Sequence, residues 1–214
     1  MDLPAGPEAS GFARTLIHTR QNVSPKRLLE PGPSRQQLQT ILEAAAAAPD
    51  HGQLVPWRFV IVPQDQRGRL AEVFAQALLE RDCGATPLQI EGAREKAYRA
   101  PLLVLAVARL TSDKAHASTA GRGARHPQAS EAEISDAERL VSLGCAIQNI
   151  LLSAHAIGFG TGLTSGQAMA SPHLRTLFAL QDHEKAVCCI NIGTVSQRKP
   201  ARVRPAADQY VSSL

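Results

Sequence analysis

The feature that most constrains the fold is an apolar run in the middle of the chain, from Pro101 to Ala108, which no polar residue interrupts. A strand with one face in water alternates apolar and polar residues, whereas a strand covered on both faces is apolar throughout. The run is too short for a membrane-spanning helix, which needs about 20 apolar residues. It therefore predicts a central strand in a sheet that carries other elements on both faces.

Two helices with clear start signals flank this strand in the sequence. A helix over 35–48 is predicted between Ser34, a good N-cap residue, and Pro49, which ends it. Ser135 and the glutamate three positions later have the spacing of a capping box, which opens a helix over 135–156. This second helix is the longest that the sequence predicts, so we expect it to be central to the fold.

The order of the remaining elements predicts the fold class. We expect further helices over 12–19, 65–81, 88–98 and from 171 onward, and further strands over 57–62, just before 165 and over 186–195. Such an order favours an α+β or α/β domain with one sheet covered by helices on both faces. A single domain is expected over 12–204, with tails at 1–11 and 205–214. The segment 111–132 has no periodic apolar pattern and predicts a mobile surface loop.

The composition limits the classes of function. The chain has 214 residues, a net charge of +4 and only 4 % aromatic residues. A nucleic-acid-binding module usually concentrates its positive charge and stacks bases on aromatic rings, so that class is disfavoured. The sequence contains no stretch of about 18 apolar residues, so we expect no membrane partner. A basic leader followed by an apolar segment is also absent, and we expect a cytoplasmic protein.

The four cysteines, Cys83, Cys145, Cys188 and Cys189, form no Cys-x-x-Cys pair, and no set of His and Cys has the spacing of zinc ligands. We therefore predict no metal site and free thiols, as suits a reducing compartment. Cys188 and Cys189 are adjacent within a predicted strand, so their side chains should point to opposite faces of the sheet.

Three segments carry residues suited to binding a ligand. The first is Arg20-Gln21-Asn22, which directly follows a predicted helix and has Lys26 and Arg27 nearby. A guanidinium group offers a planar fork to phosphate oxygens, and amides add further donors. From the residues alone, a solvated basic loop is the simpler explanation.

The other two segments lie further along the chain. His51 stands on a loop between a helix and a strand, where it can exchange hydrogen bonds near neutral pH or be an ordinary surface histidine. The segment 158–166 is rich in glycine and precedes a strand, the reverse of a dinucleotide-binding turn. Its glycines leave room for a flat ligand or a close backbone crossing. A plain turn after a helix is the alternative.

In this order and at these separations, the segments resemble the FMN-dependent nitroreductase family, and especially its smaller members, the NAD(P)H nitroreductases. The resemblance spans roughly Phe12 to Arg204. The motifs that carry it are Ile17-His18-Thr19-Arg20-Gln21-Asn22, Ala48-Pro49-Asp50-His51, Pro56-Trp57-Arg58-Phe59-Val60, Gly158-Phe159-Gly160-Thr161-Gly162-Leu163-Thr164-Ser165 and Ile192-Gly193-Thr194-Val195. The chain departs from the family at Gln21, usually basic, at Ala47, often Arg in small members, and at Leu163, aromatic in some of them.

The resemblance implies an α+β fold with a nitroreductase-like mixed sheet covered by helices on both faces. It implies a homodimer with a wrapped C-terminal tail, FMN shared at the dimer interface and NAD(P)H as the reductant. No catalytic side chain is expected, because flavin N5 carries the chemistry. The implied FMN-binding residues are Arg20, Gln21, Asn22, Leu163, Thr164 and Ser165, with His51 from the other subunit. Lys26 or Arg27 is expected at the pyrimidine end, and Arg198, Lys199 or Arg202 at the phosphate.

These observations lead to a main hypothesis and two alternatives. The main hypothesis is an oxidoreductase that passes a hydride from NAD(P)H through flavin N5 to a nitroaromatic or quinone-like acceptor. The first alternative is a flavin-binding protein of the same fold with little or no turnover, which Gln21 and Ala47 motivate. The second is a basic nucleic-acid-binding module, which the arginines of 198–204 motivate.

Overall fold

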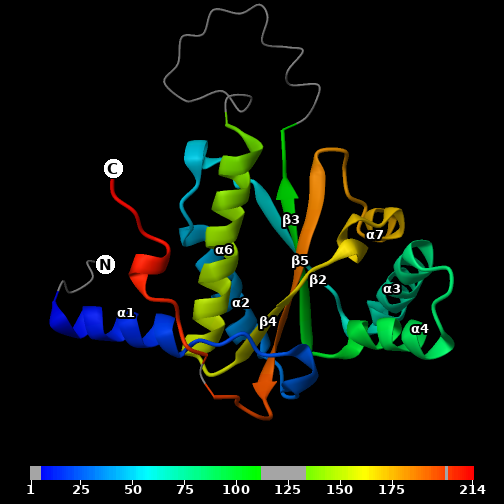
Figure 1. Ribbon diagram of the computed structural model, residues 1–214, viewed down its shortest axis with the longest axis horizontal. Helices are drawn as coiled ribbons and strands as arrows, with labels where there is room; N and C mark the ends of the chain where they lie inside the picture. Colours follow the sequence, from blue (N-terminus) through cyan, green and yellow to red (C-terminus); the bar gives the residue numbers. More distant parts are fainter. Residues whose placement is uncertain (1–5, 112–133, 201) are drawn as a thin grey trace, which may run out of the picture.

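The structure is a computed structural model that describes residues 6–111, 134–200 and 202–214. Its centre is a five-stranded sheet in the order β1-β5-β3-β2, with β4 also paired to β5 (Figure 1). The ladders between these five strands are all antiparallel. Within the described chain, parallel pairing is seen in an isolated bridge between Asn22 and Thr161, which lies outside the named strands. The strands are β1 Leu28–Leu29, β2 Trp57–Ile61, β3 Leu102–Arg109, β4 Gly160–Thr164 and β5 Glu184–Val195.

Strand β3 is the central strand that the apolar run predicts. It lies between β2 and β5, and every residue from Leu102 to Ala108 is buried. The even-numbered residues of this run belong to one apolar cluster and the odd-numbered residues to another, because successive side chains point to opposite faces. Cys188 and Cys189 divide between the two clusters in the same way. The predicted sheet with two covered faces is therefore confirmed.

Two long segments cover one face of the sheet (Figure 1). They are α6 (Asp136–Ala156) and α2 (Arg35–Glu43), which continues as the 3-10 turn η2 (Ala44–Ala47). Both helices begin with a complete capping box, built on Ser135 in α6 and on Ser34 in α2. These side chains satisfy backbone N–H groups that have no partner within the helix, so the predicted helix starts are confirmed.

The opposite face is covered by α3 (Arg67–Arg81), α4 (Pro87–Arg94) and α7 (Pro172–Leu177). The first residue of α3, Arg67, is fully buried, and burial lowers the pKa of its guanidinium group. It donates hydrogen bonds to the backbone carbonyls of Val62, Ala97, Ala100 and Pro101. A buried charge is tolerated only when its donors are satisfied. Arg67 therefore fixes the segment between α4 and β3, which includes the turn η5 (Glu95–Tyr98).

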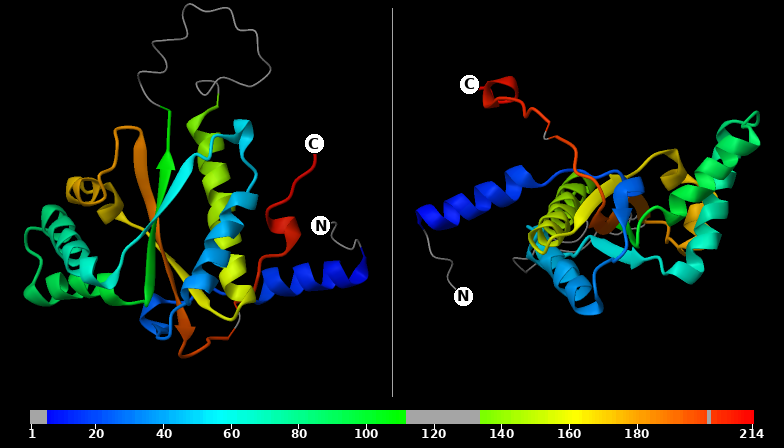
Figure 2. Two further views of the ribbon diagram at one scale, coloured as in Figure 1. Left: turned by 180° about the vertical axis from the view of Figure 1, so that it is seen from behind. Right: turned by 90° about the horizontal axis from the view of Figure 1, so that it is seen from below.

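The two ends of the described chain pack differently from the rest. Helix α1 (Pro7–Thr19) has no buried residue, and every residue of 202–214 is exposed, including the short turn η8 (Ala207–Gln209). Figure 2 shows both segments projecting on the side of α6, away from α3 and α4. An amphipathic helix with nothing buried is an element that lacks its packing partner within one chain.

Several element boundaries differ from the sequence predictions. Helix α1 begins at Pro7 rather than Phe12, because proline is well suited to the first helical turn. Strand β1 was not predicted, since two residues carry no periodic pattern. The predicted loop over 111–132 lies outside the described residues except for Thr111. Among the described helices, none is long and apolar enough to cross a membrane.

Candidate functional site

The glycine-rich segment and the Arg20-Gln21-Asn22 segment meet directly at β4. The backbone N–H of Val23 donates to the Thr161 carbonyl at 2.8 Å, and the Leu163 N–H donates to Asn22 Oδ1 at 3.0 Å. A Cβ atom at Gly162 would collide with the backbone carbonyl of Val23. Glycine is thus required at 162 because another segment crosses it closely, which is one of the two roles that the sequence suggests.

A basic pocket of about 520 Å³ opens at one end of β4. Its walls come from the residues after α1, the end of α6, the start of β4 and the chain beyond β5. Among the described residues, no aspartate or glutamate lines it. Its cationic residues are Arg20, Arg27, Arg198, Lys199, Arg202 and Arg204, and its polar residues include Thr19, Gln21, Asn22 and His155. A concentration of positive charge of this kind suits a phosphate group.

Arg20 is the most strongly constrained cation of the basic pocket. Its Nε atom is buried and has no hydrogen-bond partner, while its backbone carbonyl accepts a bond from Arg204 at 3.0 Å. Burial, and then the charge of Arg204, lower the pKa of the Arg20 guanidinium group. A buried donor without a partner costs about 1–3 kcal/mol, so an anion that accepts from Arg20 would remove a real penalty.

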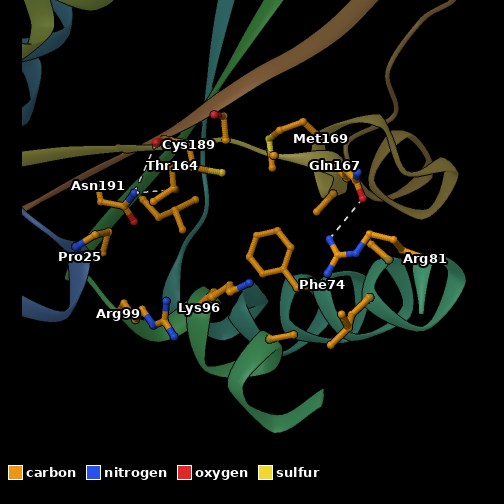
Figure 3. A pocket seen from close by; sticks show the side chains of 17 residues that line it. Pro25, Phe74, Arg81, Lys96, Arg99, Thr164, Gln167, Met169, Cys189 and Asn191 are labelled. Atoms are coloured by element: carbon orange, nitrogen blue, oxygen red, sulfur yellow. Dashed lines mark hydrogen bonds between the residues drawn. The ribbon is translucent and has the colours of Figure 1, made fainter. Parts of the chain in front are cut away.

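A second, mixed pocket of about 240 Å³ lies at the other end of β4 (Figure 3). Its apolar walls come from α3, β3 and the segment after β4, and cations from α3 and the 95–99 segment line it. Thr164, Ser165 and Gly166 form one side. The other lining residues include Phe74, Leu78, Leu103, Met169 and Cys189, the cations Arg81, Lys96 and Arg99, and Asn191. This combination suits a flat apolar ring system with a polar edge.

Two side chains in the mixed pocket show how its polar groups are held. Asn191 is buried, and its Nδ2 donates to Thr164 Oγ1 at 3.0 Å (Figure 3). The same Nδ2 also donates to the Gly162 carbonyl at 3.1 Å. Thr164 Oγ1 therefore acts as an acceptor toward Asn191, and its own proton is left to donate elsewhere. Arg99, like Arg20, has a buried Nε without a partner.

Cys189 is the one thiol that lines either pocket in the described part of the chain. Burial raises the pKa of its thiol to about 12. A thiol with that pKa stays protonated near neutral pH and is a poor nucleophile. Of the described residues, no histidine or carboxylate lines the mixed pocket. Covalent or acid–base chemistry by side chains therefore has no support in this pocket.

His51 lies apart from both pockets. Its Nδ1 is 3.0 Å from Oε1 of Glu138, near the start of α6, and its side chain is 62 % exposed. The basic pocket lies near the other end of α6, at His155, and the 17 helical steps from Glu138 to His155 correspond to about 25 Å of helix. The loop around His51 is strained, since Gln53 and Val55 have positive φ angles. One chain therefore does not bring His51 to the other candidate residues.

The structure divides the remaining predicted residues between the basic pocket, the mixed pocket and positions outside both. Arg20, Gln21 and Asn22 line the basic pocket, as do Arg27, Arg198, Lys199 and Arg202, whereas Thr164 and Ser165 line the mixed pocket. Lys26 and Leu163 line neither. Sequence reasoning did not find Lys96, Arg99 or Asn191, because each lies on an element whose place beside β4 only the fold decides. His155 was not singled out either, although it stands close before β4, because a single histidine near a helix end forms no motif. The tail arginine Arg204 was noted only as part of a basic stretch.

Comparison with known proteins assigns the family. The sequence pattern of the Nitroreductase family matches residues 22–194. The chain is 30 % identical over 192 residues to a Haemophilus influenzae protein named "Putative NAD(P)H nitroreductase", covering 90 % of this chain and 93 % of that protein. It is 31 % identical over 182 residues to Escherichia coli YdjA, which bears the same name, covering 85 % and 87 % of the two chains. The chain therefore belongs to the nitroreductase family, and its class is that of an oxidoreductase.

Solved structures agree on the fold. A nitroreductase-like protein from Bacillus cereus superimposes with a TM-score of 0.74 at 15 % identity, over 100 % of this chain and 98 % of that chain. A nitroreductase from Desulfitobacterium hafniense with bound FMN superimposes with a TM-score of 0.62 at 18 % identity, over 94 % and 97 % of the two chains. These neighbours confirm the α+β, nitroreductase-like fold that the sequence motifs predict.

Proposed function

We propose that the chain is an FMN-dependent oxidoreductase that passes a hydride from NAD(P)H to a nitroaromatic or quinone-like acceptor. The observation that carries this proposal is the pairing of two unlike pockets along one short strand. Gly160 and Thr161 of β4 line the basic pocket, and Thr164 at its other end lines the mixed pocket. A ligand lying along β4 would have an anionic end and a flat ring end, which is the plan of a flavin mononucleotide.

The residues of the two pockets fit a flavin mononucleotide in two ways. The basic pocket offers a buried, unpartnered Nε of Arg20 to a phosphate, and the mixed pocket offers the equivalent atom of Arg99 to a polar ring edge. Arg20, Gln21 and Asn22 would hold the phosphate and the ribityl chain. Thr164 and Ser165 would lie beside the isoalloxazine ring, which supplies the hydride chemistry at its N5 atom when FMN is bound.

The cations of the mixed pocket have an electrostatic role in this proposal. Lys96 and Arg99 line the pocket together with Thr164, whereas Lys26 does not. Positive charge near the pyrimidine end of the ring stabilises the negative charge that reduction places there. We therefore assign that role to Lys96 and Arg99, in place of the Lys26 or Arg27 that the sequence suggested. Asn191 holds the Thr164 hydroxyl in a fixed orientation beside the ring.

We further propose that the functional unit is a homodimer, in which His51 of one subunit approaches the flavin of the other. Helix α1 and the tail 202–214 bury nothing within one chain, although Phe12, Ile17 and Tyr210 are large and exposed. The outer face of α6 also exposes Val141. A second copy that packs against α6 would cover these side chains, and His51 needs such a copy to reach a ligand along β4.

The visible spectrum of the purified protein tests the flavin, and anaerobic addition of NADH and of NADPH tests the reaction. We expect a yellow protein whose flavin absorbance is bleached by at least one nucleotide and restored by a quinone. A yellow protein that neither nucleotide reduces would favour the flavin-binding protein without turnover. A colourless protein that does not take up added FMN would overturn the proposed function, and sedimentation analysis tests the dimer separately.

A further inference from the structure

His155 is a titratable group of the basic pocket that the proposed flavin chemistry does not use. It lies in the last turn of α6, is half-buried and lines the pocket together with the Arg20-Gln21-Asn22 segment. In the part of the chain that the structure describes, it is the one histidine that lines either pocket. Its two ring nitrogens have different environments, and this difference determines which nitrogen carries the proton in the neutral ring.

The Nε2 atom of His155 is held by Thr19. The Thr19 hydroxyl donates its single proton to the Thr15 carbonyl at 2.7 Å, and the same Oγ1 atom lies 2.8 Å from His155 Nε2. Because that hydroxyl proton is already committed, Oγ1 can only accept from the ring, so Nε2 carries a proton. In the neutral ring, Nδ1 is then the nitrogen with a free lone pair, and no described residue bonds to it.

The surroundings of His155 favour the neutral ring when the pocket holds no anion. Burial, and then the charges of Arg198 and Arg20, lower the pKa of His155 below its usual value. No carboxylate of the described ranges 6–111, 134–200 and 202–214 lines the basic pocket to oppose this effect. The further charged groups that face this pocket are Arg27 from the turn after α1 and Lys199, Arg202 and Arg204 from the tail.

A phosphate dianion would reverse the sign of this environment. It would offset the arginine charges and offer oxygen acceptors to a ring that already presents a proton on Nε2 to Thr19. We propose that His155 takes up one proton from solvent when a phosphate monoester binds in the basic pocket, and that it then donates from Nδ1. When the phosphate monoester is FMN, this proposal rests on the proposed function. The binding of FMN is then coupled to the uptake of a proton by His155.

The coupling has a definite sign. A group that binds a proton more tightly in the complex than in the free protein makes affinity fall as pH rises. The phosphate of FMN is itself almost fully a dianion above about pH 7, since its second pKa is near 6. Between pH 7 and 8.5 we therefore expect the Kd of the wild-type protein for FMN to rise with pH, by up to about tenfold per unit.

Calorimetry of FMN binding to the FMN-free protein, in two phosphate-free buffers of different ionisation enthalpy, measures the proton uptake directly. At pH 7.5 we expect a clear fraction of a proton taken up per FMN by the wild type. His155→Gln keeps a donor for Thr19 but cannot titrate, so its uptake should be close to zero and its affinity about tenfold lower. His173→Gln is the matched control, because His173 pairs with Glu80 and lies outside the basic pocket.

Two further measurements keep the proposal open to refutation. Riboflavin lacks the phosphate and should bind without proton uptake. Nitrogen-15 spectra of the His155 ring in the wild type, with and without FMN, report its protonation without any substitution. A ring that stays neutral in the complex, or equal uptake by the wild type and His155→Gln, would overturn the proposal. If FMN does not bind at all, the proposed function is wrong. The same titration with inorganic phosphate then tests proton uptake by His155 independently of FMN.

Discussion

The basic pocket and the mixed pocket share strand β4 but are built in different ways. The basic pocket draws its charges from segments at the periphery, the turn after α1 and the chain beyond β5. The mixed pocket is walled by α3, β3 and β5, which belong to the buried core. The difference suggests a division of work in which peripheral charges provide affinity for the anionic end of a ligand, and the rigid core sets the reactivity of its ring.

The largest effect is expected from Arg20→Ala in the basic pocket. Loss of charge-assisted hydrogen bonds of about 1.5–3 kcal/mol should weaken FMN binding by about 10- to 150-fold, as measured by quenching of flavin fluorescence. Riboflavin, which has no phosphate, should lose much less affinity. The control is Arg14→Ala on α1, whose residue is exposed and lines neither pocket. Equal losses for FMN and riboflavin would contradict the division between the pockets.

The next effect concerns the stability of strand β5, which contributes residues to both pockets. Glu184 begins β5, is buried and forms a two-pronged ion pair with Arg58, at 2.6 and 2.8 Å. This hydrogen-bonded pair holds the pKa of Glu184 at about 2. A depressed carboxyl pKa stabilises the fold fully above about pH 5 and progressively less as pH falls toward 2.

Glu184→Gln should therefore lower the free energy of unfolding at pH 7 by about 2–3 kcal/mol, measured by urea denaturation. The difference from the wild type should shrink steadily between pH 5 and pH 3. Affinity for FMN should stay within about twofold, because Glu184 lies at the start of β5 and neither it nor Arg58 lines either pocket. A pH-independent difference would show that the ion pair is not its source.

A smaller effect is expected from Arg99→Gln in the mixed pocket. Removing this charge should lower the two-electron potential of the bound flavin by about 30 mV, the equivalent of a tenfold change in equilibrium constant. The rate of anaerobic reduction by NAD(P)H should fall by a similar factor, while FMN affinity should fall by less than in Arg20→Ala. Lys26→Gln is the matched control, since Lys26 lines neither pocket. If the control lowers the potential as much as Arg99→Gln does, the assignment of the pyrimidine end is wrong.

The smallest effect is a response to salt. Raising the ionic strength from about 0.05 to 0.5 M shortens the Debye length and screens exposed charges. Most of the basic pocket's cations are exposed, so the Kd for FMN should rise by a few fold, whereas that for riboflavin should hardly change. Equilibrium titrations of both ligands at several salt concentrations provide the measurement. If salt weakened the binding of riboflavin as much as that of FMN, the proposed difference between the basic pocket and the mixed pocket would be wrong.

Local signals allowed most of the fold to be predicted. The uninterrupted apolar run marks β3 as central, Ser34 and Ser135 mark helix starts, and both signals depend only on neighbouring residues. Strand β1 escaped prediction because its two residues have no period of their own and pair only with the end of β5. The site was predicted in part, from motifs whose glycines and arginines stand close together in the sequence.

The sequence by itself determined that this chain forms a sheet covered on both faces and belongs to an oxidoreductase family whose motifs lie in a fixed order. Only the tertiary structure decided which charges surround β4. Lys96 and Arg99 belong to a segment far from β4 in sequence, and their positions depend on packing between elements, such as the buried Arg67 that fixes the 97–101 segment. His155 lies close to β4 in sequence, but the neighbours that it meets in the basic pocket depend on where α1 and the C-terminal tail pack. Periodicity records which face of an element is buried, but it carries no information about which elements meet across a pocket.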